Sequence, residues 1–91
     1  MDYSVGDRAR ISLQYHWAKG AKGTIQAPPE SVQDLGADQD PWEGNCRFVK
    51  GRKGFIKFYW VEFDEPQIDA DGDGPYSAGE IEADVLVPIS E

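Results

Sequence analysis

The sequence predicts a single all-β domain over residues 1–91, a small barrel of about five antiparallel strands with two long loops. Glycine and proline interrupt the chain every dozen residues or so. The segments between them either alternate apolar with polar residues or are rich in aromatic and β-branched residues, and none shows a helical period. With 91 residues, three Trp, four Tyr and four Phe, the chain can build one hydrophobic core but not two.

The first two strands are predicted by their alternation. After a Gly-Asp turn, the opening segment directs Ala9, Ile11 and Leu13 toward the core. A glycine-bracketed turn at residues 20–23 follows, and the next strand places Ile25 inside. These two strands are therefore expected to form a hairpin.

Two loops and three further strands complete the predicted barrel. Residues 28–46 form a long loop rich in Pro, Gly, Asp and Gln, and residues 64–79 form a second, acidic loop. A turn at 51–54 is predicted to join two strands. Short strands are expected around 80–82 and 87–89.

The strongest strand of the chain is predicted over residues 55–63, which are aromatic or β-branched almost throughout. One face of this strand carries Tyr59, Val61 and Phe63, and the other carries Ile56, Phe58 and Trp60. A chain of this size has little material to cover both faces. We therefore expect one face to remain exposed as an aromatic strip that a partner can meet.

The charge is unevenly distributed along the chain. Nine basic and seventeen acidic residues give a net charge of −8, which disfavours nucleic acids and anionic membranes as partners. All the bases precede residue 58, and five of them lie between 47 and 57, where there is no acid. The turn at 51–54 within this basic segment reads Gly-Arg-Lys-Gly and resembles the G-x-x-G backbone clamp of KH domains, although here it joins strands.

The chain carries no sign of export. Its one cysteine, Cys46, cannot form an internal disulfide, and no apolar run approaches the roughly 20 residues that cross a bilayer. Met1 is followed by Asp2, where a signal peptide would have a basic segment. These features predict a cytoplasmic protein without a membrane span.

Four segments together resemble an SH3-like small barrel. They are Val-Gly-Asp-Arg-x-Arg-Ile at 5–11, Gly-x-x-Gly-Thr-Ile at 20–25, Trp-Val-Glu-Phe-Asp at 60–64 and Ala-Asp-Val-Leu-x-Pro-Ile at 83–89. Among families with this barrel, the chain resembles the variable chain of ferredoxin-thioredoxin reductase, the small accessory subunit of photosystem I and the barrel of the nitrile hydratase β-subunit. The resemblance implies a non-catalytic barrel docked against a redox or metal-bearing partner.

The aromatic residues are the candidate partner-binding residues. The rings exceed what so narrow a barrel normally encloses, and Trp and Tyr often anchor interfaces. The predicted binding residues are Trp17, Trp42, Phe58 and Trp60. Catalysis is not expected, because His16 is the only histidine and neither it nor Cys46 belongs to a nucleophile signature.

The acidic loop matches the calcium-loop spacing of an EF-hand through Asp69, Asp71, Asp73 and Glu80. Pro66 and Gly79 discourage the flanking helices of a true EF-hand. The two interpretations of this loop are therefore a weak Ca²⁺ site and an acidic turn with solvated carboxylates.

The sequence as a whole predicts a non-catalytic protein–protein interaction module or accessory subunit that is monomeric when isolated and needs no cofactor. Its partner would be a protein with a basic or apolar surface, toward which the acidic third of the chain steers it. Two alternatives remain open: a calcium-binding module that uses residues 69–80, and an acidic inhibitor or antitoxin-like protein that binds a basic partner.

Overall fold

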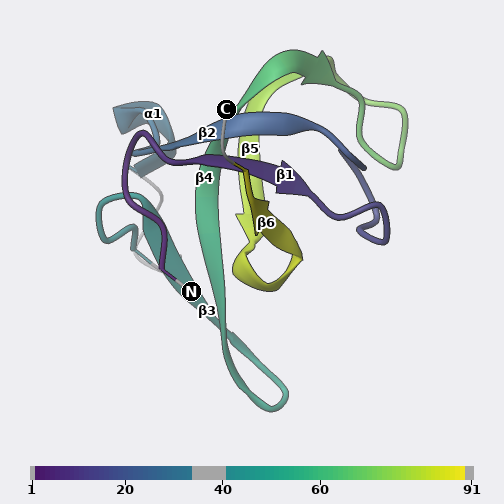
Figure 1. Ribbon diagram of the computed structural model, residues 1–91. Coiled ribbons are helices and arrows are strands. Elements are labelled where there is room, and N and C mark those ends of the chain that lie inside the picture. Colours follow the sequence, from purple (N-terminus) through teal and green to yellow (C-terminus); the bar gives the residue numbers. More distant parts are fainter. Residues whose placement is uncertain (1, 34–40, 90–91) are drawn as a thin grey trace.

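The computed structural model describes residues 2–33 and 41–89, and these form one curved antiparallel sheet of six strands with very little helix (Figure 1). The all-β prediction is therefore confirmed, with one strand more than expected. The elements in chain order are β1 (Arg8–Ile11), β2 (Lys22–Gln26), α1 (Glu30–Gln33), β3 (Cys46–Gly51), β4 (Gly54–Gln67), β5 (Tyr76–Glu82), the 3₁₀ turn η1 (Ala83–Val85) and β6 (Leu86–Pro88).

Five of the strands follow one another through the sheet in the order β5-β4-β2-β1-β6. The short turn η1 carries the chain from β5 to β6, and β6 then returns to pair with β1, with Leu86 opposite Ile11. The first strand, β1, and the last strand, β6, thus lie side by side. The additional strand β3 pairs with the first part of β4.

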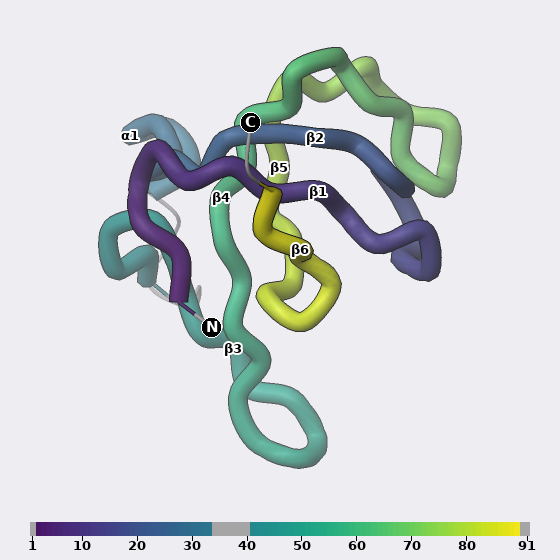
Figure 2. The backbone as a smooth tube through the Cα atoms, viewed as in Figure 1, coloured from purple at the N-terminus to yellow at the C-terminus, as the bar shows by residue number. Residues whose placement is uncertain are grey.

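Strand β4 is long enough to change partner along one of its edges. It pairs with β3 from Gly54 to Tyr59, and with β2 from Trp60 to Phe63. The resulting β3–β4 hairpin projects beyond the rest of the sheet, at the bottom of the view in Figure 2. Its turn lies at residues 51–54, as the sequence predicts.

The core contains the residues that the alternation of the strands directs inward. Ala9, Ile11, Ile25 and the predicted inner face of β4 are buried, together with Ile81 and Leu86. Burying each large apolar side chain contributes about 1.5–3 kcal/mol. Leu13 was expected inside and is 75% exposed, because β1 ends at Ile11 and the chain turns away before reaching it.

The N-terminal segment closes one end of the core around Tyr3. The Tyr3 hydroxyl donates a hydrogen bond of 3.1 Å to the carbonyl of Leu86, and the backbone N–H of Tyr3 donates one of 3.0 Å to the Tyr59 hydroxyl. The Asn45 side-chain amide donates to the carbonyl of Tyr3 at 2.9 Å. Burial raises the pKa of Tyr3 above its ordinary value.

Both predicted loops are shorter than expected. Strand β4 continues to Gln67 and β5 begins at Tyr76, so the acidic loop between them covers only residues 68–75. Asp64 belongs to β4, where Arg8 of β1 donates two hydrogen bonds of 2.5 and 2.7 Å to its carboxylate.

The predicted loop at 28–46 contains the helix α1, and Cys46 already belongs to β3. Residues 34–40 of that loop lie outside the described residues. Within the described parts of the chain, no helix has the length and apolar character to cross a membrane.

Candidate functional site

The outer face of β4 carries an apolar strip that the sheet leaves partly uncovered. Ile56, Phe58 and Trp60 make up this outer strip. Ile56 is 40% exposed, and Phe58 and Trp60 are half-buried. The opposite face of the same strand points into the core, so the predicted division of β4 into a buried and an uncovered face is correct.

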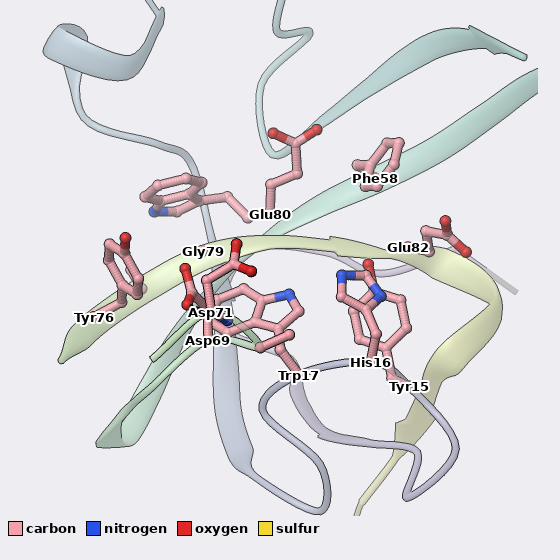
Figure 3. Close-up of a pocket in the computed structure, with 13 residues that line it drawn as sticks. Tyr15, His16, Trp17, Phe58, Asp69, Asp71, Tyr76, Gly79, Glu80 and Glu82 are labelled. Atoms are coloured by element: carbon pink, nitrogen blue, oxygen red, sulfur yellow. Dashed lines mark hydrogen bonds between the residues drawn. The ribbon is translucent and has the colours of Figure 1, made fainter. Parts of the chain in front are cut away.

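The outer strip runs into a groove of about 590 Å³ that lies along β5 (Figure 3). We call it the aromatic–acidic groove. Its aromatic lining comes from β4, from β5 and from the loop after β1, and its acidic lining comes from β5 and the 68–75 loop. The residues that define it are Tyr15, His16, Trp17, Phe58, Trp60, Asp69, Asp71, Tyr76, Glu80 and Glu82.

Trp17 lies against β5 at Gly79, where only a glycine leaves room for it. A Cβ atom on Gly79 would lie 2.6 Å from Cη2 of the Trp17 indole. The indole makes edge-to-face contacts with Phe63 at 5.5 Å and Tyr76 at 6.1 Å between ring centroids. Trp17 is half-buried, so one part of its ring packs on the core while another part lines the groove.

The groove is predominantly acidic, since none of the described residues that line it is a Lys or Arg. Desolvation, followed by the carboxylates of Asp69 and Asp73, raises the pKa of the Tyr76 phenol. Glu82 has no ion pair with any residue in 2–33 or 41–89 and is half-buried at the edge of the groove. A cation entering this groove would therefore meet unneutralised negative charge.

Glu80 is the acid of the groove that has a strong partner. Arg47 of β3 donates to both of its carboxylate oxygens at 2.7 Å, and again through Nε at 3.0 Å. The two side chains are only 13% and 28% exposed. The same guanidinium lies 5.4 Å from the centroid of the Trp42 ring, a cation–π distance.

Trp42 and Trp60 form an edge-to-face pair at 5.8 Å, and each is half-buried. Their indole nitrogens are buried and have no hydrogen-bond partner among the described residues. Of the four predicted partner-binding residues, the structure brings Trp17, Phe58 and Trp60 into the groove. Trp42 does not line it and instead contacts Trp60 and Arg47.

The predicted metal ligands are only partly brought together. One carboxylate oxygen each from Asp69, Asp71 and Asp73 lies within 4.8 Å of the others. One Asp69 oxygen already accepts the backbone N–H groups of Asp71 at 3.0 Å and Asp73 at 2.9 Å, an arrangement that orders the loop by itself. Glu80 is not a member of this group, so the spacing match lacks its twelfth-position ligand.

Two residues of the groove, Tyr76 and Glu82, are not among the residues predicted from the sequence, and neither is Arg47, the partner of Glu80. Ala78, Glu80 and Glu82 alternate on β5, and this period of two was the available signal. The sequence predicts a loop over 64–79 and a strand only around 80–82, so Tyr76 and Ala78 are separated from the rest of this alternation. Arg47 has no such signal, because its partner is distant in the sequence.

His16 is exposed and lines the groove, with its ring centroid 4.3 Å from that of Tyr15. Cys46 is a half-buried residue of β3 and is not among the lining residues. The expectation that the chain is not an enzyme stays a prediction.

Comparison with protein-family models, with curated proteins and with solved structures finds no match for this chain.

Proposed function

We propose that the protein is a non-catalytic interaction module, or accessory subunit, that binds an extended segment of a partner protein in the aromatic–acidic groove. The segment would carry basic side chains beside apolar ones. The observation that carries this proposal is the juxtaposition of partly buried aromatic rings with carboxylates in a groove that has no Lys or Arg among the described residues that line it.

The aromatic rings supply the apolar part of the affinity. Trp17, Trp60 and Tyr76 are each large and partly uncovered, and such rings are frequent anchors of protein interfaces. A Lys or Arg over the face of a Trp gains about 0.5–1 kcal/mol at an exposed site and more where water is excluded.

Glu82 and Asp71 supply the charge that selects a basic segment over an acidic one. Glu80 contributes less, because Arg47 already neutralises it. The groove thus combines one carboxylate neutralised by Arg47 with two, those of Asp71 and Glu82, that have no ion pair with any residue in 2–33 or 41–89. Such an arrangement favours specificity and association rate more than raw affinity.

The free edge of β5 favours an extended ligand. Among the described strands, β5 pairs only with β4, so the backbone groups along its other edge have no strand partner. An extended segment laid along such an edge can form backbone hydrogen bonds while its side chains reach neighbouring pockets.

The proposal is tested with two synthetic peptides of the same length, one alternating Arg with Leu and the other alternating Glu with Leu. We expect the Arg peptide to shift the NMR signals of the Trp17 indole N–H and of the Gly79 backbone. The Glu peptide should leave both unchanged. Equal binding of both peptides, or shifts outside the groove alone, would contradict the proposal.

A pair of variants separates the groove from general acidity. Glu82→Gln removes a groove carboxylate and should weaken binding of the Arg peptide about two- to fivefold. Asp84→Asn removes an exposed acid of η1 that does not line the groove and should have no effect. A basic partner held by charge alone, as expected of an acidic inhibitor, would respond equally to both variants and would be released by salt.

A further inference from the structure

The β3–β4 hairpin exposes a second surface. It lies on the same face of β4 as the buried Tyr59, but in the part of the strand that projects beyond the core. Residues directly opposite one another on antiparallel strands share a face. Phe48 is opposite Lys57, and Lys50 is opposite Phe55. These four residues therefore lie together on one face, which we call the hairpin face, and the outer strip lies on the opposite face.

The hairpin face holds two phenyl rings in solvent. Phe55 is 69% exposed and Phe48 is 41% exposed. The Lys57 ammonium lies 5.6 Å from the centroid of Phe48 and forms an ion pair with Asp2 at 2.9 Å, which fixes its position near the base of the hairpin. The Phe48 and Phe55 rings are thus presented on two paired strands.

The charge of the hairpin is wholly positive. Residues 46–57 contain no acid, and Lys50, Arg52 and Lys53 are exposed with no ion pair to any residue in 2–33 or 41–89. The carboxylates of the aromatic–acidic groove lie along β5, and the hairpin projects away from the 68–75 loop in Figure 2. At physiological salt the Debye length is about 8 Å, so this local positive charge acts largely independently of the net charge of −8.

We propose that the hairpin face binds single-stranded nucleic acid, with Lys50, Arg52 and Lys53 contacting phosphates and Phe48 and Phe55 stacking on bases. Positive charge complements the phosphate backbone, and flat exposed rings complement unstacked bases. A duplex would satisfy the charges and leave the rings unused, because its bases are already stacked on one another.

An anionic bilayer would also attract the positive charge of the hairpin, but it fits the hairpin face less well than single-stranded nucleic acid does. The four residues at the tip, Gly51-Arg52-Lys53-Gly54, have no apolar side chain, so a bilayer approached by the tip would meet charge first. The rings instead alternate with lysines along the two strands, where a chain of nucleotides can follow them.

The test uses the full chain and a fluorescent oligo(dT) of about 12 nucleotides, followed by anisotropy between about 50 and 200 mM salt. We expect a dissociation constant below about 10⁻⁴ M at the lower salt, and a log–log salt slope near −2 for three phosphate contacts at about −0.7 each. Phe55→Ala should weaken binding about tenfold through lost stacking. The double variant Lys50→Gln/Lys53→Gln should reduce the slope to about −0.7.

Two matched controls make the result specific. Leu13→Ala removes an equally exposed apolar side chain, and Lys19→Gln removes an exposed lysine, both in the loop after β1. Neither should change binding. The proposal is overturned if oligo(dT) does not bind at about 10⁻⁴ M, if Phe55→Ala binds as the unaltered protein does, or if vesicles rich in anionic lipid bind while the oligonucleotide does not.

Discussion

Replacing Gly79 with alanine tests the packing that forms the floor of the aromatic–acidic groove. The added Cβ would lie 2.6 Å from Cη2 and 2.9 Å from Cζ2 of Trp17, so the indole must move by about 0.8 Å to reach an ordinary contact. Its neighbours Phe63 and Tyr76 restrict that movement. Overpacking of this kind lowers the free energy of unfolding by about 1–3 kcal/mol. About 0.4–1 kcal/mol of this is offset, because alanine reduces the conformational entropy of the unfolded chain.

We therefore expect Gly79→Ala to lower the free energy of unfolding by roughly 1–2 kcal/mol, and Tm by roughly 5–15 °C for a domain of this size. Urea and thermal unfolding followed by circular dichroism measure both. Gly51→Ala is the matched control, because its Cβ would lie 3.1 Å from the flexible tip of Ile56 and at an ordinary contact distance of 3.4 Å from the Gly54 carbonyl oxygen, and its φ is likewise outside the left-handed region. If the two variants are equally stable, Trp17 does not lie against β5 and the groove is built differently.

Two further predictions concern ion pairs. Arg47→Ala leaves the half-buried Glu80 carboxylate without this partner and removes the cation beside Trp42. It should therefore lower the free energy of unfolding, measured in urea, by about 1–3 kcal/mol. A decrease below about 0.5 kcal/mol would show that the pair does not stabilise the fold. Arg8 holds the pKa of the Asp64 carboxyl below its ordinary value, so this pair stabilises the fold above about pH 4, and its contribution is lost as pH falls through the folded pKa. Arg8→Gln should bring the NMR-measured pKa of Asp64 back toward about 3.9, and an unchanged pKa would contradict the pairing.

The parts of the fold that follow from short-range alternation were predictable from the sequence. Ile11 and Ile25 are buried because each lies on a strand whose neighbours alternate, and the division of β4 into two faces follows from the same period. Leu13 shows the limit of this reasoning. The apolar alternation continues past the end of the strand, and only the hydrogen bonds of the sheet decide that β1 stops at Ile11.

The groove was less predictable, because its members are brought together by pairings that are distant in the sequence. Trp17, Trp60 and Phe58 were found from residue type alone, since large rings in a small barrel cannot all be enclosed. Glu80 illustrates the opposite case. Its spacing from three aspartates is that of a calcium loop. The register of the strands nevertheless places it near Arg47, which donates hydrogen bonds to both of its carboxylate oxygens.

The length of β4 explains why the molecule has two surfaces to offer. A straight strand of 14 residues would span roughly 46 Å, which exceeds the 36 Å longest dimension of the fold, so β4 must curve. Its first part, which pairs with β3, projects beyond the core (Figure 2). Over the core, the inner face of β4 is buried at Tyr59, Val61 and Phe63. Beyond the core, the same face is exposed at Phe55. Because the two faces of the strand point in opposite directions, a substitution at Phe55 leaves the outer strip unchanged, and the two proposed binding activities can be abolished separately.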